Sequence, residues 1–305
     1  MKIPASAPTW ALLAGAALWG VVWYPYRLLA QSGFDGIWAT VATYGTALIV
    51  GVAIFPREAA RLRHMPPLAL LMGLAIGWSN LAYVLGILDG EVMRVLLLFY
   101  LAPLWTVPLA WLVLRERLDA PGVAVMALAF AGAMAMLWKP SLGVPWPTAR
   151  AEWLGLAAGF LFALGNVLIR RLSTMTDAGK SIVIWAGVTF AALVHAPASS
   201  VGAMELGHAL RAQWPLVAAI GIVLVAMSLA LQYGLARMPA NRAIVILLSE
   251  LVVAAIAAYA LAGETLRAQD WLGGALIVAA SLASGWLNAR QPGAVPRPAD
   301  SGERG

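Results

Sequence analysis

The chain has 305 residues, of which 62% are hydrophobic and only 11% are charged, with 20 Lys and Arg against 14 Asp and Glu. Its mean hydropathy of +0.83 leaves too few polar side chains to cover a water-soluble domain, so the composition predicts a membrane protein. The absence of cysteine excludes disulfide frameworks and thiolate metal sites.

Apolar runs recur along the chain at a length that can cross the hydrocarbon core of a bilayer as a helix. Turn and charge signals separate the runs, and the proline-rich break at 139–152 is expected to be an exposed loop. Pro103 and Pro108 are expected to kink the fourth run, whereas the ninth has no internal proline and is expected to be straighter. The expected spans are 10–29, 36–55, 67–88, 92–114, 120–138, 153–172, 180–196, 214–235, 240–261 and 271–287.

The basic residues indicate the orientation of these ten spans. An even number of spans places both termini on one side, and 14 of the 20 Lys and Arg fall on that side against 6 on the other. Since positive residues concentrate in cytoplasmic loops, both termini are predicted to be cytoplasmic. The isoelectric point near 10.0 does not indicate nucleic acid, because the basic residues lie in short clusters between apolar runs. The polar tail at 289–305 is predicted to be a disordered cytoplasmic segment.

The sequence also contains an internal repeat. One ungapped register lays Glu116 on Glu264 and Arg94 on Arg242, and the front of each half begins with a similar tryptophan-led apolar run. Residues 8–138 and 153–288 then form two units of five spans each. Because five is odd, the second unit must be inserted upside down relative to the first, which is typical of secondary transporters. The predicted fold is therefore all-α, with ten transmembrane helices arranged as two inverted five-helix repeats.

The segments 83–116 (YVLGILDGEVMRVLLLFYLAPLWTVPLAWLVLRE) and 230–264 (ALQYGLARMPANRAIVILLSELVVAAIAAYALAGE) resemble the fourth- and ninth-helix signatures of the drug/metabolite transporter superfamily, in its EamA family. This resemblance extends over roughly residues 8–288. It implies a multi-pass carrier of the inner membrane that exports amino acids, other metabolites or drugs. The sequence departs from the family pattern in two places, since Glu250 is followed by Leu251 instead of proline, and Ala102 replaces the acid before Pro103.

Polar and aromatic side chains inside the spans are the candidate substrate-binding residues. An aromatic pocket with few hydrogen-bonding groups suits an amphipathic organic solute, although core packing also explains aromatic residues in the middle of a helix. Ser228 is a further residue that could line the cavity. The candidates are Trp19, Trp23, Tyr44, Trp78, Asn80, Tyr83, Tyr100, Trp105, Asn166, Trp185, Gln232, Tyr233 and Glu250.

Glu250 is the one carboxylate inside the ninth run, near the expected midplane. Because an ionisable group at that depth costs on the order of 3 kcal/mol, it is expected to face the interior or a wet cavity. Three roles stay open at this point: a proton carrier, a ligand for a cationic group, or a hydrogen-bonding link between helices.

The sequence favours a transporter over an enzyme. It has no phosphate-binding GxxxxGK[ST] loop and no HExxH pattern, and neither a cofactor nor a metal site is predicted. The expected partners are a small-molecule substrate and the lipid bilayer, with the chain acting as a monomer or homodimer. A passive, channel-like facilitator and an intramembrane lipid-modifying enzyme are the alternatives.

Overall fold

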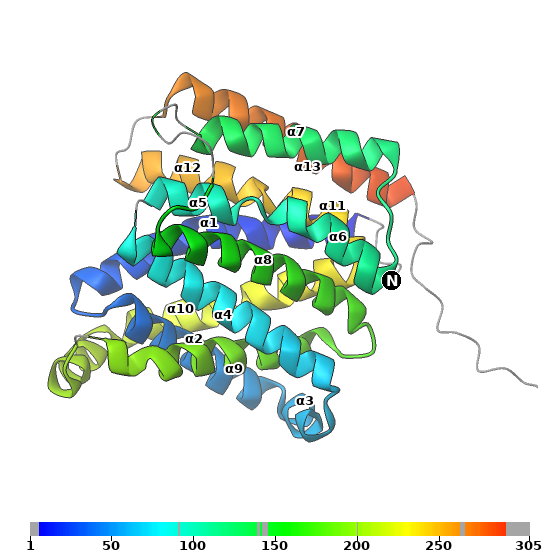
Figure 1. Ribbon diagram of the computed structural model, residues 1–305. Coiled ribbons are helices and arrows are strands. Elements are labelled where there is room, and N and C mark those ends of the chain that lie inside the picture. The colour runs from blue at the N-terminus through cyan, green and yellow to red at the C-terminus, as the bar shows by residue number, and fades with distance from the viewer. Residues whose placement is uncertain are drawn as a thin grey trace, which may run out of the picture.

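The computed structural model describes residues 6–90, 92–138, 141, 146–199, 201–262 and 266–290, and within these ranges it contains helices and no strands (Figure 1). The elements of the first half are α1 (Ala7–Gln31), α2 (Gly36–Ile54), α3 (Pro56–Arg61), η1 (Leu62–His64), α4 (Pro67–Asp89), α5 (Val92–Phe99), α6 (Ala102–Leu114) and α7 (Ala120–Leu137). Those of the second half are α8 (Arg150–Arg171), α9 (Asp177–His195), η3 (Ala196–Ala198), α10 (Ala203–Arg237), α11 (Ala240–Leu247), α12 (Ser249–Ala262) and α13 (Ala268–Arg290).

The described residues include ten helical segments that are long and apolar enough to span a membrane. They confirm the all-α membrane fold and the ten spans predicted from the sequence. Two segments differ in extent from the prediction. α10 begins at Ala203, well before the expected start at residue 214, and α8 begins at Arg150, inside the expected loop at 139–152. The tail expected at 289–305 lies outside the described residues from residue 291 onward, while residues 289 and 290 still belong to α13.

The fourth and ninth spans are both interrupted near the middle. α5 ends at Phe99 and α6 resumes at Ala102, while α11 ends at Leu247 and α12 resumes at Ser249. The straighter ninth span remains a prediction, since one residue, Leu248, separates its two helices, against two, Tyr100 and Leu101, in the fourth. Its interruption needs no proline, because the N–H of Leu251 donates to the carbonyl of Leu248 three residues back, at 3.1 Å, which tightens the turn locally.

The element boundaries repeat with a constant offset. α11 begins at Ala240, 148 residues after α5 begins at Val92. The same offset of 148 residues separates the ends of these two helices, the ends of α6 and α12, and the starts of α7 and α13. The register found in the sequence therefore describes the same helices twice.

The contacts between helices also repeat from one half of the chain to the other. α4 packs against α8 and α9, and its counterpart α10 packs against α1 and α2. α7 pairs with its own counterpart α13, as Figure 1 shows at one edge of the bundle. The equivalent arginines lie at opposite faces: Arg242 is 3.7 Å from Asp119 at the face where α1 begins, and Arg94 is 2.6 Å from Glu152 at the other. These contacts support inverted repeats, and we call the face where α1 begins the terminal face.

Candidate functional site

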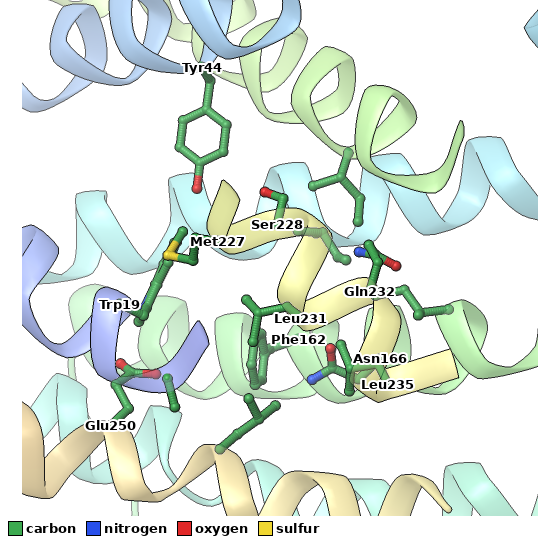
Figure 2. Close-up of a pocket in the computed structure, with 15 residues that line it drawn as sticks. Trp19, Tyr44, Phe162, Asn166, Met227, Ser228, Leu231, Gln232, Leu235 and Glu250 are labelled. Atoms are coloured by element: carbon green, nitrogen blue, oxygen red, sulfur yellow. The ribbon is translucent and has the colours of Figure 1, made fainter. Parts of the chain in front are cut away.

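A cavity of about 90 Å³ lies in the middle of the bundle (Figure 2). Both repeats contribute to its wall, through α1, α2 and α4 of the first and α8 to α12 of the second. The wall is mostly apolar, with a few polar side chains among large hydrophobic ones. Its residues are Ala16, Trp19, Tyr44, Ile76, Phe162, Asn166, Ile169, Ile184, Met227, Ser228, Leu231, Gln232, Leu235, Leu247 and Glu250.

Glu250 is the one charged residue among those that line this cavity in the described chain. It lies in the first turn of α12, directly after the interruption of the ninth span. The hydroxyl of Tyr100, at the interruption of the fourth span, donates a hydrogen bond of 2.9 Å to Glu250 Oε1. The two interrupted helices, one from each repeat, are therefore joined by the acid that borders the cavity.

Two side-chain amides form a second polar region of the wall, away from Glu250. Figure 2 shows Glu250 and Trp19 toward one end of the cavity, Asn166 and Gln232 toward the other, and Leu231 and Phe162 between them. Asn166 is 5% exposed and Gln232 is 3% exposed. Within the described chain, Asn166 Nδ2 and Gln232 Oε1 are buried and have no hydrogen-bond partner. Since buried polar groups are almost always paired, both amides have binding capacity that the protein itself does not use.

Five of the thirteen sequence-predicted site residues line the cavity, and Tyr100 reaches it through Glu250. The five are Trp19, Tyr44, Asn166, Gln232 and Glu250. Trp185 lies directly behind the wall: it is fully buried, and its indole N–H donates a hydrogen bond of 2.9 Å to the hydroxyl of cavity-lining Ser228.

The structure does not place the remaining six predicted residues in the cavity wall. Asn80 is partly buried on α4. Four of the other five have aromatic or cation–π contacts outside the wall: Trp23 with Tyr24, Trp78 with Phe190, Trp105 with Phe160, and Tyr233 under the guanidinium of Arg237 at 3.9 Å. Tyr83 packs behind the wall on Phe99, which contacts the lining residue Phe162.

The prediction missed the apolar part of the wall. Phe162 precedes Asn166 by four residues on α8, and Leu231 and Leu235 are separated by four residues on α10. Helical spacing from the polar residues could have found these side chains, because residues three or four apart share a face. Composition alone could not have found them, since most residues of these helices are apolar.

A hydrogen-bonded cluster of Glu116, Arg170, Ala236 and Ala240 lies at the terminal face, and we call it the terminal-face cluster. Arg170 Nε donates to Glu116 Oε1 at 3.1 Å, and Arg170 Nη1 donates to the carbonyl of Ala236 at 2.8 Å. The N–H of Ala240 donates to Glu116 Oε2 at 2.9 Å. Arg170 and Ala236 directly follow the cavity-lining residues Ile169 and Leu235, so this cluster holds α6, α8, α10 and α11 together beside the cavity.

Comparison with known proteins places this architecture in a family. A solved structure described as a crystal structure of a protein shares the fold, with a TM-score of 0.70 at 19% identity, covering 93% of this chain and 98% of that one. The search of curated proteins found no match. The sequence profile described as EamA-like transporter family matches residues 7–138 and again residues 149–286. Because the two matches cover nearly the whole chain, one for each repeat, the chain belongs to the EamA-like transporter family.

Proposed function

We propose that this protein is a secondary carrier of the inner membrane that exports a small amphipathic organic solute by alternating access through the central cavity. The observation that carries the proposal is a cavity between two inverted repeats, with one partly buried acid beside the interruptions of both discontinuous helices. Secondary transporters place their substrate sites at such a repeat interface.

The cavity wall supports an amphipathic solute. Trp19, Tyr44 and Phe162 offer aromatic surface, while Glu250 and the two amides offer separated polar contacts. Such a wall binds an organic molecule by apolar contact and orients it with few hydrogen bonds. It supports an enzyme poorly, since Glu250 has neither a second acid nor a histidine beside it among the described lining residues.

The terminal-face cluster supports alternating access over a continuous channel. It joins Glu116 of the first repeat to Arg170 and Ala240 of the second, so the two repeats are held together at one face. A rocking motion of one repeat against the other would break these contacts and open the cavity to that face. A passive, channel-like facilitator is the alternative, and counterflow separates the two because only a carrier accelerates uptake when solute is present on the far side.

The orientation of the chain is also a proposal. The excess of Lys and Arg on the terminal side supports cytoplasmic termini, with 14 of the 20 on that side. Reporter fusions after Arg290 and in the loop around Arg115 should both report the cytoplasm, and reports from opposite sides would refute the orientation.

Glu250→Gln tests the proposed carrier. The amide is similar in size and can still accept the hydrogen bond from Tyr100, so the variant should reach the membrane in normal amount. Metabolite profiling of cells that overexpress the protein identifies candidate solutes, and counterflow in proteoliposomes then measures their flux. We expect flux through Glu250→Gln to fall by about tenfold or more, because the cavity loses its one charge.

Glu205→Gln is the matched control, because Glu205 is an exposed glutamate in the first turn of α10, away from the cavity. Flux through this variant should equal that of the unchanged protein. Undiminished flux through Glu250→Gln would remove Glu250 from the mechanism. If no solute showed counterflow while lipid turnover changed, the enzyme alternative would replace the carrier.

A further inference from the structure

We infer that the cavity binds a protonated amine whose other end is a neutral hydrogen-bonding group such as a carboxamide, and that it discriminates against a solute carrying a carboxylate. This inference rests on the proposed function, because it names the class of solute for the same cavity. Three observations carry it: the position of Glu250, the unpartnered amides, and the absence of a positive side chain among the described residues that line the cavity.

Glu250 supplies the contact for the amine. The hydrogen bond from Tyr100 occupies Oε1, and within the described part of the chain Oε2 accepts no hydrogen bond. Trp19 lines the same cavity as Glu250, and an indole ring is the aromatic surface that attracts cations most strongly. An ammonium group at this end would pair with the partly buried carboxylate and neutralise its charge, which is how charges away from water are tolerated.

Asn166 and Gln232 supply the contact for the neutral end. Asn166 Nδ2 can donate a hydrogen bond and Gln232 Oε1 can accept one, and neither atom has a protein partner within the described chain. A carboxamide presents one acceptor and two donors, so it has a complementary group for each of these atoms. Phe162 and Leu231, which Figure 2 shows between the two ends, suit an apolar linker.

A carboxylate at this neutral end would find no counter-charge in the wall. Two buried cations of α8 and α9, the helices that contribute Asn166 and Ile184 to the wall, already have acidic partners: Arg170 is 3.1 Å from Glu116, and Lys180 is 3.6 Å from Asp177. Neither residue lines the cavity. Because a buried charge without a partner is costly, the wall should favour an amide over the carboxylate of the same shape.

Three probes of similar length separate these contributions: 6-aminohexanamide, 6-aminohexanoate and hexylamine. Calorimetric titration of the purified full-length protein measures their binding. We expect 6-aminohexanamide to bind most tightly, and 6-aminohexanoate to bind at least about tenfold more weakly than the amide. Hexylamine should fall between them, since it keeps the amine contact and loses only the hydrogen bonds of the amide.

Two variants assign the ends of the ligand. Glu250→Gln should weaken 6-aminohexanamide by about tenfold or more, because the amine loses its counter-charge. The double variant Asn166→Leu with Gln232→Leu should remove the preference for the amide over hexylamine, and thermal unfolding in detergent checks that the variant is folded.

Equal binding of 6-aminohexanoate, unchanged amide binding by Glu250→Gln, or no binding of any probe would each overturn the inference. Failure of this inference about the ligand is distinguishable from failure of the proposed carrier. Amine binding without counterflow would leave this ligand class standing and reject the carrier. Counterflow of another solute, with no binding of these amines, would reject this ligand class and leave the carrier standing.

Discussion

Glu116 is the residue on which the contacts of the terminal-face cluster depend. Its two oxygens accept hydrogen bonds from the guanidinium of Arg170 and from the first N–H of α11, at Ala240. Arg170 is only 7% exposed, so it needs a partner for its charge. One side chain of the first repeat thus satisfies a buried cation and a helix terminus of the second.

Glu116→Ala should destabilise the protein by about 2–5 kcal/mol, because it leaves the buried Arg170 charge without its carboxylate and the start of α11 without its acceptor. Glu116→Gln should cost less, since the amide can still accept from Ala240. Thermal unfolding in detergent measures both. A double-mutant cycle with Arg170→Met should show strong coupling, and simple additivity of the two losses would contradict the pairing.

Single residues were the least predictable part of the site. Trp19 and Trp23 share a helical face, yet only Trp19 lines the cavity, because the cavity occupies a limited depth of the bundle and Trp23 lies one turn further along α1. Spacing along one helix gives the face of a side chain but not its depth relative to other helices. Glu250 was predictable because a lone carboxylate in an apolar span has few acceptable positions.

At the level of elements, α7 and α13 show how closely these helices approach. A Cβ added at Gly273 would lie 2.5 Å from the carbonyl oxygen of Gly132, and one at Gly132 would lie 2.6 Å from the carbonyl oxygen of Gly273. Neither helix lines the cavity. This contact joins equivalent helices of the two repeats, so it serves the assembly of the bundle.

Gly273→Ala should therefore destabilise the protein by about 1–3 kcal/mol, because the new methyl group meets rigid backbone of α7. Gly274→Ala is the neighbouring control: its Cβ would lie 3.5 Å from Val252, which is ordinary van der Waals contact. Thermal unfolding should separate the two variants, while amine affinity of the folded fraction stays the same in both. Equal stability of the two variants would contradict the close approach of α7 and α13.

The elements themselves were largely predictable, and the exceptions share a cause. Hydropathy detects the part of a helix that lies in hydrocarbon, so it missed the polar first turns of α10, where Glu205, His208 and Arg211 lie. It also missed α3, which is short and charged. The interruption at Leu248 had no proline signal, and only the repeat register, which places Leu248 on Tyr100, indicates it.

The whole molecule is one bundle made from two copies of a five-helix unit, and no copy can enclose the cavity alone. Trp19 and Tyr44 come from the first repeat, while Asn166, Gln232 and Glu250 come from the second. The repeat was visible in the sequence because register and helix boundaries are preserved together. The cavity was not, because it depends on how the two copies pack across their interface.

The most direct test of the account asks whether the cavity can be reached from both sides of the membrane. Since the chain has no cysteine, Leu231→Cys places a single thiol in the cavity wall. A membrane-impermeant maleimide is applied to right-side-out and to inside-out vesicles. Ile49→Cys, on the outer surface of α2 where the side chain is 72% exposed, is the lipid-facing control and should not react in either preparation. The account predicts that Leu231→Cys reacts in both preparations, whereas reaction in neither or in only one would contradict it.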